Sequence, residues 1–287
     1  MSRTRTGQFG IGFRRGGSWQ KDLSAAIAWA KENDFECIDV RADAEQVRQV
    51  TEGGLAVGSA DLVDVRGMMS PDAGRRSEAV AANAEAVRAC APMARNFFAA
   101  LIPEDPQRAR RENFEDLLSS LSELAGVLDE CGSRMVIEGW PGPGALCCTP
   151  EAVRALFAAI DSPAMGLNYD PSHLIRMGID PLRFLGEFVG RVGHVHGKDT
   201  EILAERQYEL GREQPPTFAE PIAFGGTHWR YTIPGHGQMR WSRAFQMLAE
   251  AGYEGFVSIE LEDADFNGTE AGEKLGLLLG RRHLEGC

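Results

Sequence analysis

Four side chains that can bind a divalent metal stand at the ends of four apolar segments of this sequence: Glu138, Asp170, His196 and Glu260. Each segment is short and rich in residues that favour buried strands. A carboxylate at the end of a buried strand is costly unless it is paired or binds a cation. Three carboxylates and one imidazole suit Mn²⁺, Mg²⁺, Co²⁺ or Fe²⁺ better than a structural zinc. The residue types therefore predict a metal site, provided that the fold brings the strand ends together.

Each of these residues also has a structural explanation. A single acid at a strand end can be a helix N-cap or part of an ion pair at the rim. Asp170 precedes Pro171 and Ser172, so it can be an ordinary turn residue. Lys198 follows His196 by two residues and should point to the same side, where it can hold an oxyanion or simply pair with Asp199. These alternatives stay open at the level of sequence.

Short strands that alternate with helices run along the whole chain. We expect strands at 9–13, 36–40, within 55–63, and at 96–102, 135–140, 164–169, 191–196 and 255–260. Helical patterns fill the intervals, and the clearest covers 114–128. This alternation predicts a single (β/α)8 TIM barrel over residues 1–287, whose strand ends would meet at one face. An open doubly wound sheet is less favoured, because no G-x-G-x-x-G follows Phe13.

Residues 200–234 interrupt the alternation between the seventh strand and the seventh helix. The stretch is polar, and we expect a long loop that acts as a lid-like insertion, because long loops in compact domains tend to be functional. Trp229 offers an apolar face for a sugar ring, and His228 and Arg230 offer hydrogen-bond donors. Trp140 is a further candidate for the pocket wall. The alternative for the insertion is a contact in a homo-oligomer.

Composition narrows the class of protein. The hydrophobic content is 43%, the charged content is 25% and the net charge is −12, which counts against nucleic acid as the main partner. Six cysteines without a C-x-x-C pair indicate reduced thiols. The N-terminus has no apolar segment typical of a signal peptide, and the longest apolar run, 97–102, is too short to span a membrane. We expect a cytoplasmic protein with no membrane partner.

The motifs around these strand ends resemble those of the xylose isomerase-like barrels, in particular the sugar phosphate isomerase/epimerase branch. The resemblance rests on Ile137-Glu138, Asp170-Pro-Ser-His173, His194-Val-His-Gly-Lys-Asp199 and Ser258-Ile-Glu260. It implies a divalent metal, Mn²⁺ first with Mg²⁺, Co²⁺, Fe²⁺ or Zn²⁺ as alternatives, held by Glu138, Asp170, His196 and Glu260. The second histidine of the H-x-H pair is the usual ligand, which favours His196 over His194.

The resemblance also implies roles in carbohydrate metabolism. The two glutamates act as acid and base on opposite faces of a sugar substrate, and His173 contacts a substrate oxygen. The chemistry agrees, since inverting or moving a stereocentre beside a carbonyl requires removal of a proton from carbon, and a metal stabilises the resulting enediolate. We therefore predict a metal-dependent isomerase or epimerase acting on a small sugar, a keto-sugar or a sugar phosphate.

Two features depart from compact ketose epimerases: the long insertion and Glu260-Leu-Glu-Asp263. They are more similar to relatives that act on keto-sugars, keto-glycosides and keto-inositols by elimination. A lyase or dehydratase on a 3-keto-sugar, or a deglycosidase, is therefore the alternative. An endonuclease IV-like nuclease is disfavoured by the acidic charge. A non-catalytic barrel that binds a metabolite is the third class.

Overall fold

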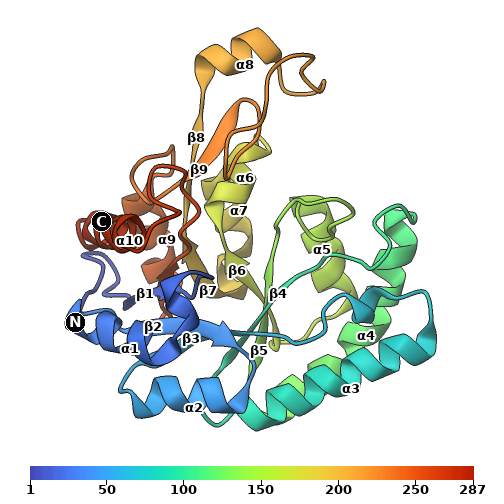
Figure 1. Cartoon of the computed structure of the whole chain (residues 1–287). Coiled ribbons are helices and arrows are strands. Elements are labelled where there is room, and N and C mark those ends of the chain that lie inside the picture. The colour runs from blue at the N-terminus through green and yellow to red at the C-terminus, as the bar shows by residue number, and fades with distance from the viewer. The chain divides into compact units, whose positions relative to one another are not determined.

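The computed structural model describes residues 1–287. By strand order its main sheet is a closed parallel barrel, β1-β10-β7-β6-β5-β4-β3-β2 (Figure 1). The eight strands are β1 (Ile11–Arg14), β2 (Cys37–Arg41), β3 (Ala56–Asp61), β4 (Asn96–Ala100), β5 (Arg134–Glu138), β6 (Met165–Tyr169), β7 (Val192–Gly197) and β10 (Val257–Ile259). The predicted (β/α)8 fold is confirmed, with strand ends that differ from the prediction by a few residues at most.

Helices follow the strands as expected, and most begin at a side chain that caps them. They are α1 (Leu23–Glu32), α2 (Ala44–Glu52), α3 (Ala73–Cys90), α4 (Arg110–Glu130), α5 (Pro150–Ala159), α6 (Pro171–Arg176), α7 (Pro181–Phe188), α8 (Ala204–Leu210), α9 (Trp241–Glu250) and α10 (Glu270–Glu285), with short 3₁₀ turns at Trp19–Lys21, Gly67–Met69 and Val189–Arg191. The sequence did not predict α6, because six residues are too few to show a helical period. Its start signals are present: Asp170 is the N-cap and Pro171 follows it.

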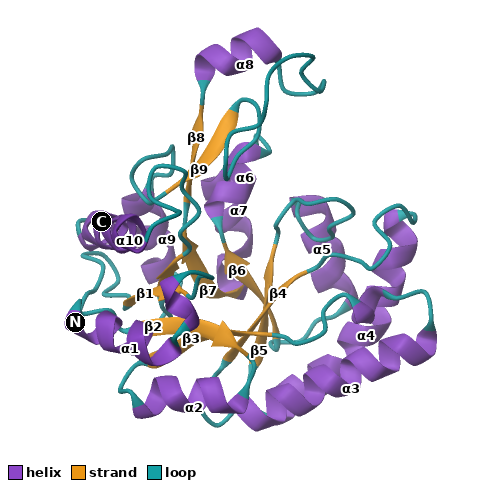
Figure 2. Cartoon of the chain, viewed as in Figure 1, coloured by secondary structure: helices purple, strands orange, loops and turns teal.

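The chain forms two compact units, and the larger run of strands lies in the second unit, Cys37–Tyr169 and Gly190–Val195. Here β2 to β6 pair in parallel, and the paired residues Ala100 and Glu138 end β4 and β5. Phe97, Val136 and Ile137 are fully buried in this unit. The long helices α3 and α4 also belong to this unit and pack against each other (Figure 2).

The first unit contains Met1–Glu36, Asp170–Val189 and His196–Cys287. In it β1 pairs with β10, so that Phe13 lies beside Ile259. Two further strands, β8 (Asp199–Ile202) and β9 (Trp229–Thr232), form an antiparallel ribbon, and α8 lies at the tip of this ribbon (Figure 1). The expected long loop at 200–234 is therefore wrong at its base. The base is a regular ribbon, because Trp-Arg-Tyr-Thr in β9 has high strand propensity although each strand is only four residues long.

Two further expectations from composition can be compared with the structure. All six cysteines are free thiols. The helices include none with the length and apolar character needed to cross a bilayer. The expectation of one domain over residues 1–287 stays a prediction.

Candidate metal and substrate site

Asp170 uses its two carboxylate oxygens for different purposes. Oδ1 accepts hydrogen bonds from the backbone N–H of Ser172 at 2.9 Å and from its hydroxyl at 2.6 Å, and so caps α6. Oδ2 faces Nε2 of His173 at 3.3 Å, Nζ of Lys198 at 3.2 Å and Nδ1 of His196 at 3.9 Å. The N-cap and the metal-ligand interpretations of Asp170 are therefore compatible, since each takes one oxygen.

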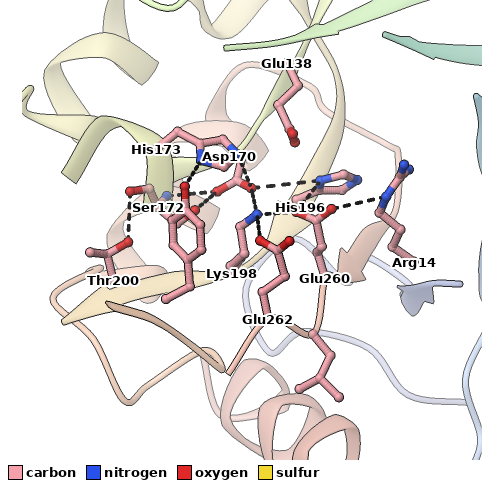
Figure 3. Close-up of polar contacts among 12 residues, drawn as sticks. Arg14, Glu138, Asp170, Ser172, His173, His196, Lys198, Thr200, Glu260 and Glu262 are labelled. Carbon is pink, nitrogen blue, oxygen red and sulfur yellow. Dashed lines mark hydrogen bonds and ion pairs between the residues drawn. The ribbon is translucent and has the colours of Figure 1, made fainter. Parts of the chain in front are cut away.

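Lys198 is a buried ammonium surrounded by carboxylates. Its side chain is 1% exposed and lies 3.0 Å from Oε2 of Glu262, in addition to its ion pairs with Asp170 and Glu260 (Figure 3). Its Nζ also lies 4.6 Å from the centre of the Tyr231 ring. Burial raises the pKa of Glu262, and the charge of Lys198 opposes this shift. The alternative in which Lys198 merely pairs with Asp199 is wrong.

Asp199 instead holds the base of the insertion together. Its buried carboxylate accepts hydrogen bonds from the backbone N–H groups of Thr200, Gly235 and Met239 and from Nε1 of Trp241. Burial raises the pKa of Asp199, and these donors oppose the shift. Asp199 is thus a structural residue whose carboxylate accepts from three backbone N–H groups and one indole N–H.

His196 and Glu260 complete the ligand-type side chains of the first unit. Nδ1 of the fully buried His196 lies 3.5 Å from Oε2 of Glu260, and Oε1 of Glu260 pairs with Nε of Arg14 at 3.1 Å (Figure 3). Asp170, His196 and Glu260 each offer a ligand atom within 4.8 Å of one another. Two carboxylate oxygens and one imidazole nitrogen at this spacing fit a divalent cation.

A hydrogen-bonded chain of side chains joins Asp170 to the insertion. Nδ1 of His173 lies 2.7 Å from the hydroxyl of Tyr231, and Nη1 of Arg176 donates to the same oxygen at 2.5 Å. Burial raises the pKa of Tyr231, so its hydroxyl keeps its proton. Arg176 cannot accept that proton, and the adjacent acceptor is Nδ1 of His173. This arrangement leaves Nε2–H of His173 directed at Asp170.

The remaining predicted ligand, Glu138, belongs to the second unit. Glu138 ends β5, is 4% exposed, and accepts a hydrogen bond from Nδ2 of Asn168 at 2.7 Å. In the same unit Nε2 of His194 lies 3.0 Å from Oδ2 of Asp39. His194 thus has a buried carboxylate partner of its own. The place of Glu138 in a shared site stays a prediction, and so does the role of Trp140.

The three predicted residues of the insertion lie in different surroundings. The guanidinium of Arg176 lies over the indole ring of Trp229, with its Cζ atom 4.5 Å from the centre of that ring. Arg230 pairs with Glu201 at 2.7 Å and with Asp265 at 2.8 Å, so its donors tie the ribbon to the segment after β10. His228 lines a separate pocket beside α6. Their roles in substrate binding stay predictions.

Sequence reasoning missed four residues of this site: Arg14, Arg176, Tyr231 and Glu262. A signal existed for two of them. Arg14 ends the first strand, and Glu262 follows Glu260 by two residues. Together with Glu260 they line a cavity of about 200 Å³. Tyr231 and Arg176 gave no signal, because the ribbon and the short α6 that position them were not predicted.

A comparison with known proteins extends these observations. Residues 24–281 match the family described as xylose isomerase-like TIM barrel. The chain belongs to this family. The resemblance drawn from the strand-end motifs is thereby confirmed.

Similar proteins include a dehydratase, an epimerase and a protein with a bound zinc atom. An inosose dehydratase from Clostridium tetani is 29% identical over 151 residues, which are 53% of this chain and 48% of that protein. The chain thus spans about half the length of this curated relative. The structure of the 3-keto-D-glucoside 4-epimerase YcjR from E. coli superimposes with a TM-score of 0.69 at 16% identity, over 96% of this chain and 99% of that one. The structure of the IOLI protein with a bound zinc atom superimposes with a TM-score of 0.66 at 16% identity. The match covers 96% of this chain and 95% of that one.

Proposed function

We propose that this xylose isomerase-like barrel is a divalent-metal-dependent enzyme that removes a proton alpha to the carbonyl of a keto-sugar or related polyhydroxylated ketone. The observation that carries the proposal is the convergence of ligand atoms from Asp170, His196 and Glu260 within 4.8 Å. Glu138 would be the fourth ligand, because the strand ends of this fold share one face. A bound ion would supply Lewis-acid stabilisation of the charge that develops on the substrate oxygens.

The residues of the chain fit such an ion. Asp170 Oδ2 stays available on the site side because Oδ1 alone caps α6. Manganese is the first choice, since oxygen-rich ligation with one nitrogen suits it. Zinc is an alternative supported by the bound zinc of the IOLI protein.

The protein groups around this position have distinct tasks in the proposed reaction. Glu138 and Glu260 remove and return the proton on carbon, one from each face of the substrate. Lys198, held among carboxylates, donates to an oxygen that becomes negatively charged. His173, oriented by Tyr231, contacts a substrate oxygen. The cavity beside Arg14 and Glu262 gives the substrate room to enter.

Two outcomes follow from the same first step. Return of the proton gives an isomerase or epimerase, which is the main proposal. Loss of a β-hydroxyl gives a dehydratase, and the similarity to inosose dehydratase favours this second candidate. Elimination requires a donor that protonates the leaving hydroxyl, and Lys198 and Glu262, 3.0 Å apart, are the candidates for this role.

Proton NMR in D₂O with keto-sugars, keto-glycosides and keto-inositols distinguishes the outcomes. The isomerase or epimerase incorporates deuterium at the alpha carbon and keeps every substituent. In the dehydratase reaction the substrate loses water, so the product has one oxygen fewer. Metal analysis of the purified protein accompanies the screen. If the metal-loaded protein exchanges no alpha proton on any of these substrates, the proposal is wrong.

The finer properties belong to the same proposal. We propose a small sugar or keto-sugar as the partner, a cytoplasmic location, and no nucleic-acid or membrane partner. The acidic net charge of −12 supports the absence of nucleic acid. The exposed side chains of Tyr208 and Phe218 in the insertion support a homo-oligomer.

A further inference from the structure

A second pocket lies in the first unit, beside α6 and the insertion. Its volume is about 340 Å³, at the lower end of the roughly 300–1,000 Å³ typical of small-molecule sites. Arg176, Arg212 and His228 line it together with Gln238 and Asp180. None of these five residues is one of the metal-ligand side chains described above. The pocket is therefore distinct from the cluster of metal-ligand side chains, and Arg176 is the residue that links the two.

The charge of this pocket is opposite to that of the whole chain. Two guanidinium groups line it, whereas the net charge of the protein is −12. The one acid among the lining residues, Asp180, caps α7: its Oδ1 accepts hydrogen bonds from the backbone N–H groups of Leu182 and Arg183, and its single negative charge is outnumbered by the two guanidinium groups. The local balance favours an anionic ligand.

His228 points to the same ligand class. The residue is 8% exposed, and its buried Nδ1 has no hydrogen-bond partner within the protein. A buried polar atom without a partner costs about 1–3 kcal/mol, so an oxygen of a ligand in this pocket would gain by pairing with Nδ1. Burial and the nearby charge of Arg212 lower the pKa of His228. The neutral imidazole can donate Nδ1–H to an oxyanion that also meets the two guanidinium groups.

We propose that this pocket binds a small molecule through a phosphate or carboxylate group held by Arg176, Arg212 and His228. Arg176 gives the pocket a route to the candidate catalytic residues, because the same guanidinium donates to Tyr231, whose hydroxyl meets His173. The anionic group belongs either to the substrate or to a separate ligand. Binding does not depend on the proposed function, but the effect on turnover does.

Calorimetric titration with inorganic phosphate and with acetate tests the binding step, against sodium chloride at equal ionic strength. We expect one of the two anions to bind the parent protein, and Arg212→Gln and His228→Asn each to weaken that binding at least tenfold. Arg243→Gln, an exposed arginine of α9, is the matched control and should leave binding unchanged. No binding above the chloride background, or equal binding in all variants, overturns the proposal. Thermal unfolding of each variant checks that it is folded.

Kinetics with a substrate found in the NMR screen identify the source of the anion. Competition between phosphate and substrate assigns the group to the substrate, and a change in kcat without competition assigns it to a separate ligand. If phosphate binds but neither competes with the substrate nor changes kcat, the proposed connection through Arg176 is wrong. If the screen finds no substrate, the proposed function fails while the phosphate titration still decides the existence of the site.

Discussion

At the scale of single residues, Lys198 has the most demanding environment of the site. A fully buried ammonium among Asp170, Glu260 and Glu262 compensates their charge within the protein. Removing one partner from a buried charge cluster typically costs about 3–5 kcal/mol. We therefore expect Lys198→Met to lower the unfolding free energy of the metal-free protein by about 3 kcal/mol, and added Mn²⁺ to restore much of it. Calorimetry with EDTA and with Mn²⁺ measures both values.

Arg111→Met is the control for this variant. Arg111 pairs with Glu115 on the exposed face of α4, where ion pairs contribute little, so its loss should change stability by less than about 1 kcal/mol. An equal loss for Lys198→Met in EDTA and in Mn²⁺ would show that a metal does not compensate the same carboxylates.

The two glutamates carry the proposed proton transfers. Glu138→Gln and Glu260→Gln keep the shape of each side chain but remove its ability to take a proton. We expect each variant to lose at least about a hundredfold in kcat, the usual scale of a general base, while circular dichroism stays that of the parent. Near-parental rates in either variant would contradict the scheme with two carboxylates. Glu254→Gln, on the turn before β10, controls for the charge change.

Tyr231 is a positioning residue in the proposed site, because its hydroxyl orients His173. Tyr231→Phe removes the hydroxyl that meets Nδ1 of His173 and receives the Arg176 donor. We expect kcat/KM to fall about tenfold, the effect of one misoriented hydrogen bond of about 1.4 kcal/mol. Tyr253→Phe, which also removes one hydrogen bond of a tyrosine hydroxyl, is the control. Equal losses of activity in both variants would reduce Tyr231 to a packing residue.

At the scale of elements, the ribbon of β8 and β9 divides into a fixed base and an exposed tip. Thr200 donates its hydroxyl to the backbone carbonyl of Ser172, and Asp263 accepts the backbone N–H of Ile233, so the base is held from two sides. In contrast, α8 has no buried residue, and Tyr208 and Phe218 are 87% and 96% exposed. The base supports the site, and the tip serves another purpose.

Replacing residues 204–227 with a short Asn-Gly turn tests this division. Because the tip buries little surface, we expect the unfolding free energy to change by less than about 1 kcal/mol. A lid function predicts a higher KM in the shortened protein, and an oligomer contact predicts a smaller mass in light scattering. A large loss of stability would show that the tip supports the fold of the first unit.

At the scale of the whole molecule, the burial of Cys147 makes the stability of the protein depend on pH. Burial raises the pKa of the Cys147 thiol to about 12 from an ordinary value of 9.0. The unfolded chain therefore loses this proton first, so the contribution of Cys147 to stability is full below about pH 9 and is lost as pH rises toward about 12. We expect no reaction of Cys147 with a thiol reagent at pH 8 in the native state, and rapid reaction in urea. Mass spectrometry locates the labelled residue, with the partly exposed Cys131 as the internal control.

The sequence predicted the barrel because each strand carries its own apolar signal. It also predicted the ligand-type residues at strand ends, since Asp170, His196 and Glu260 need only correct strand ends to be brought together. It did not predict their partners. The sequence offers Lys198 either an oxyanion or Asp199 as its partner. In the structure three carboxylates that are distant from it along the chain surround it. Long-range pairing of this kind leaves no local pattern, and the same holds for Tyr231 on a four-residue strand.

The connection from β7 to β8 consists of a single residue, Lys198, between Gly197 and Asp199. The strand that carries His196 therefore continues almost directly into the insertion. An insertion built in this way can be shortened, lengthened or replaced by a different module without shifting the chain at His196. The ribbon base is thus a grafting point, at which a new specificity element can be added to this barrel while its chemistry is kept.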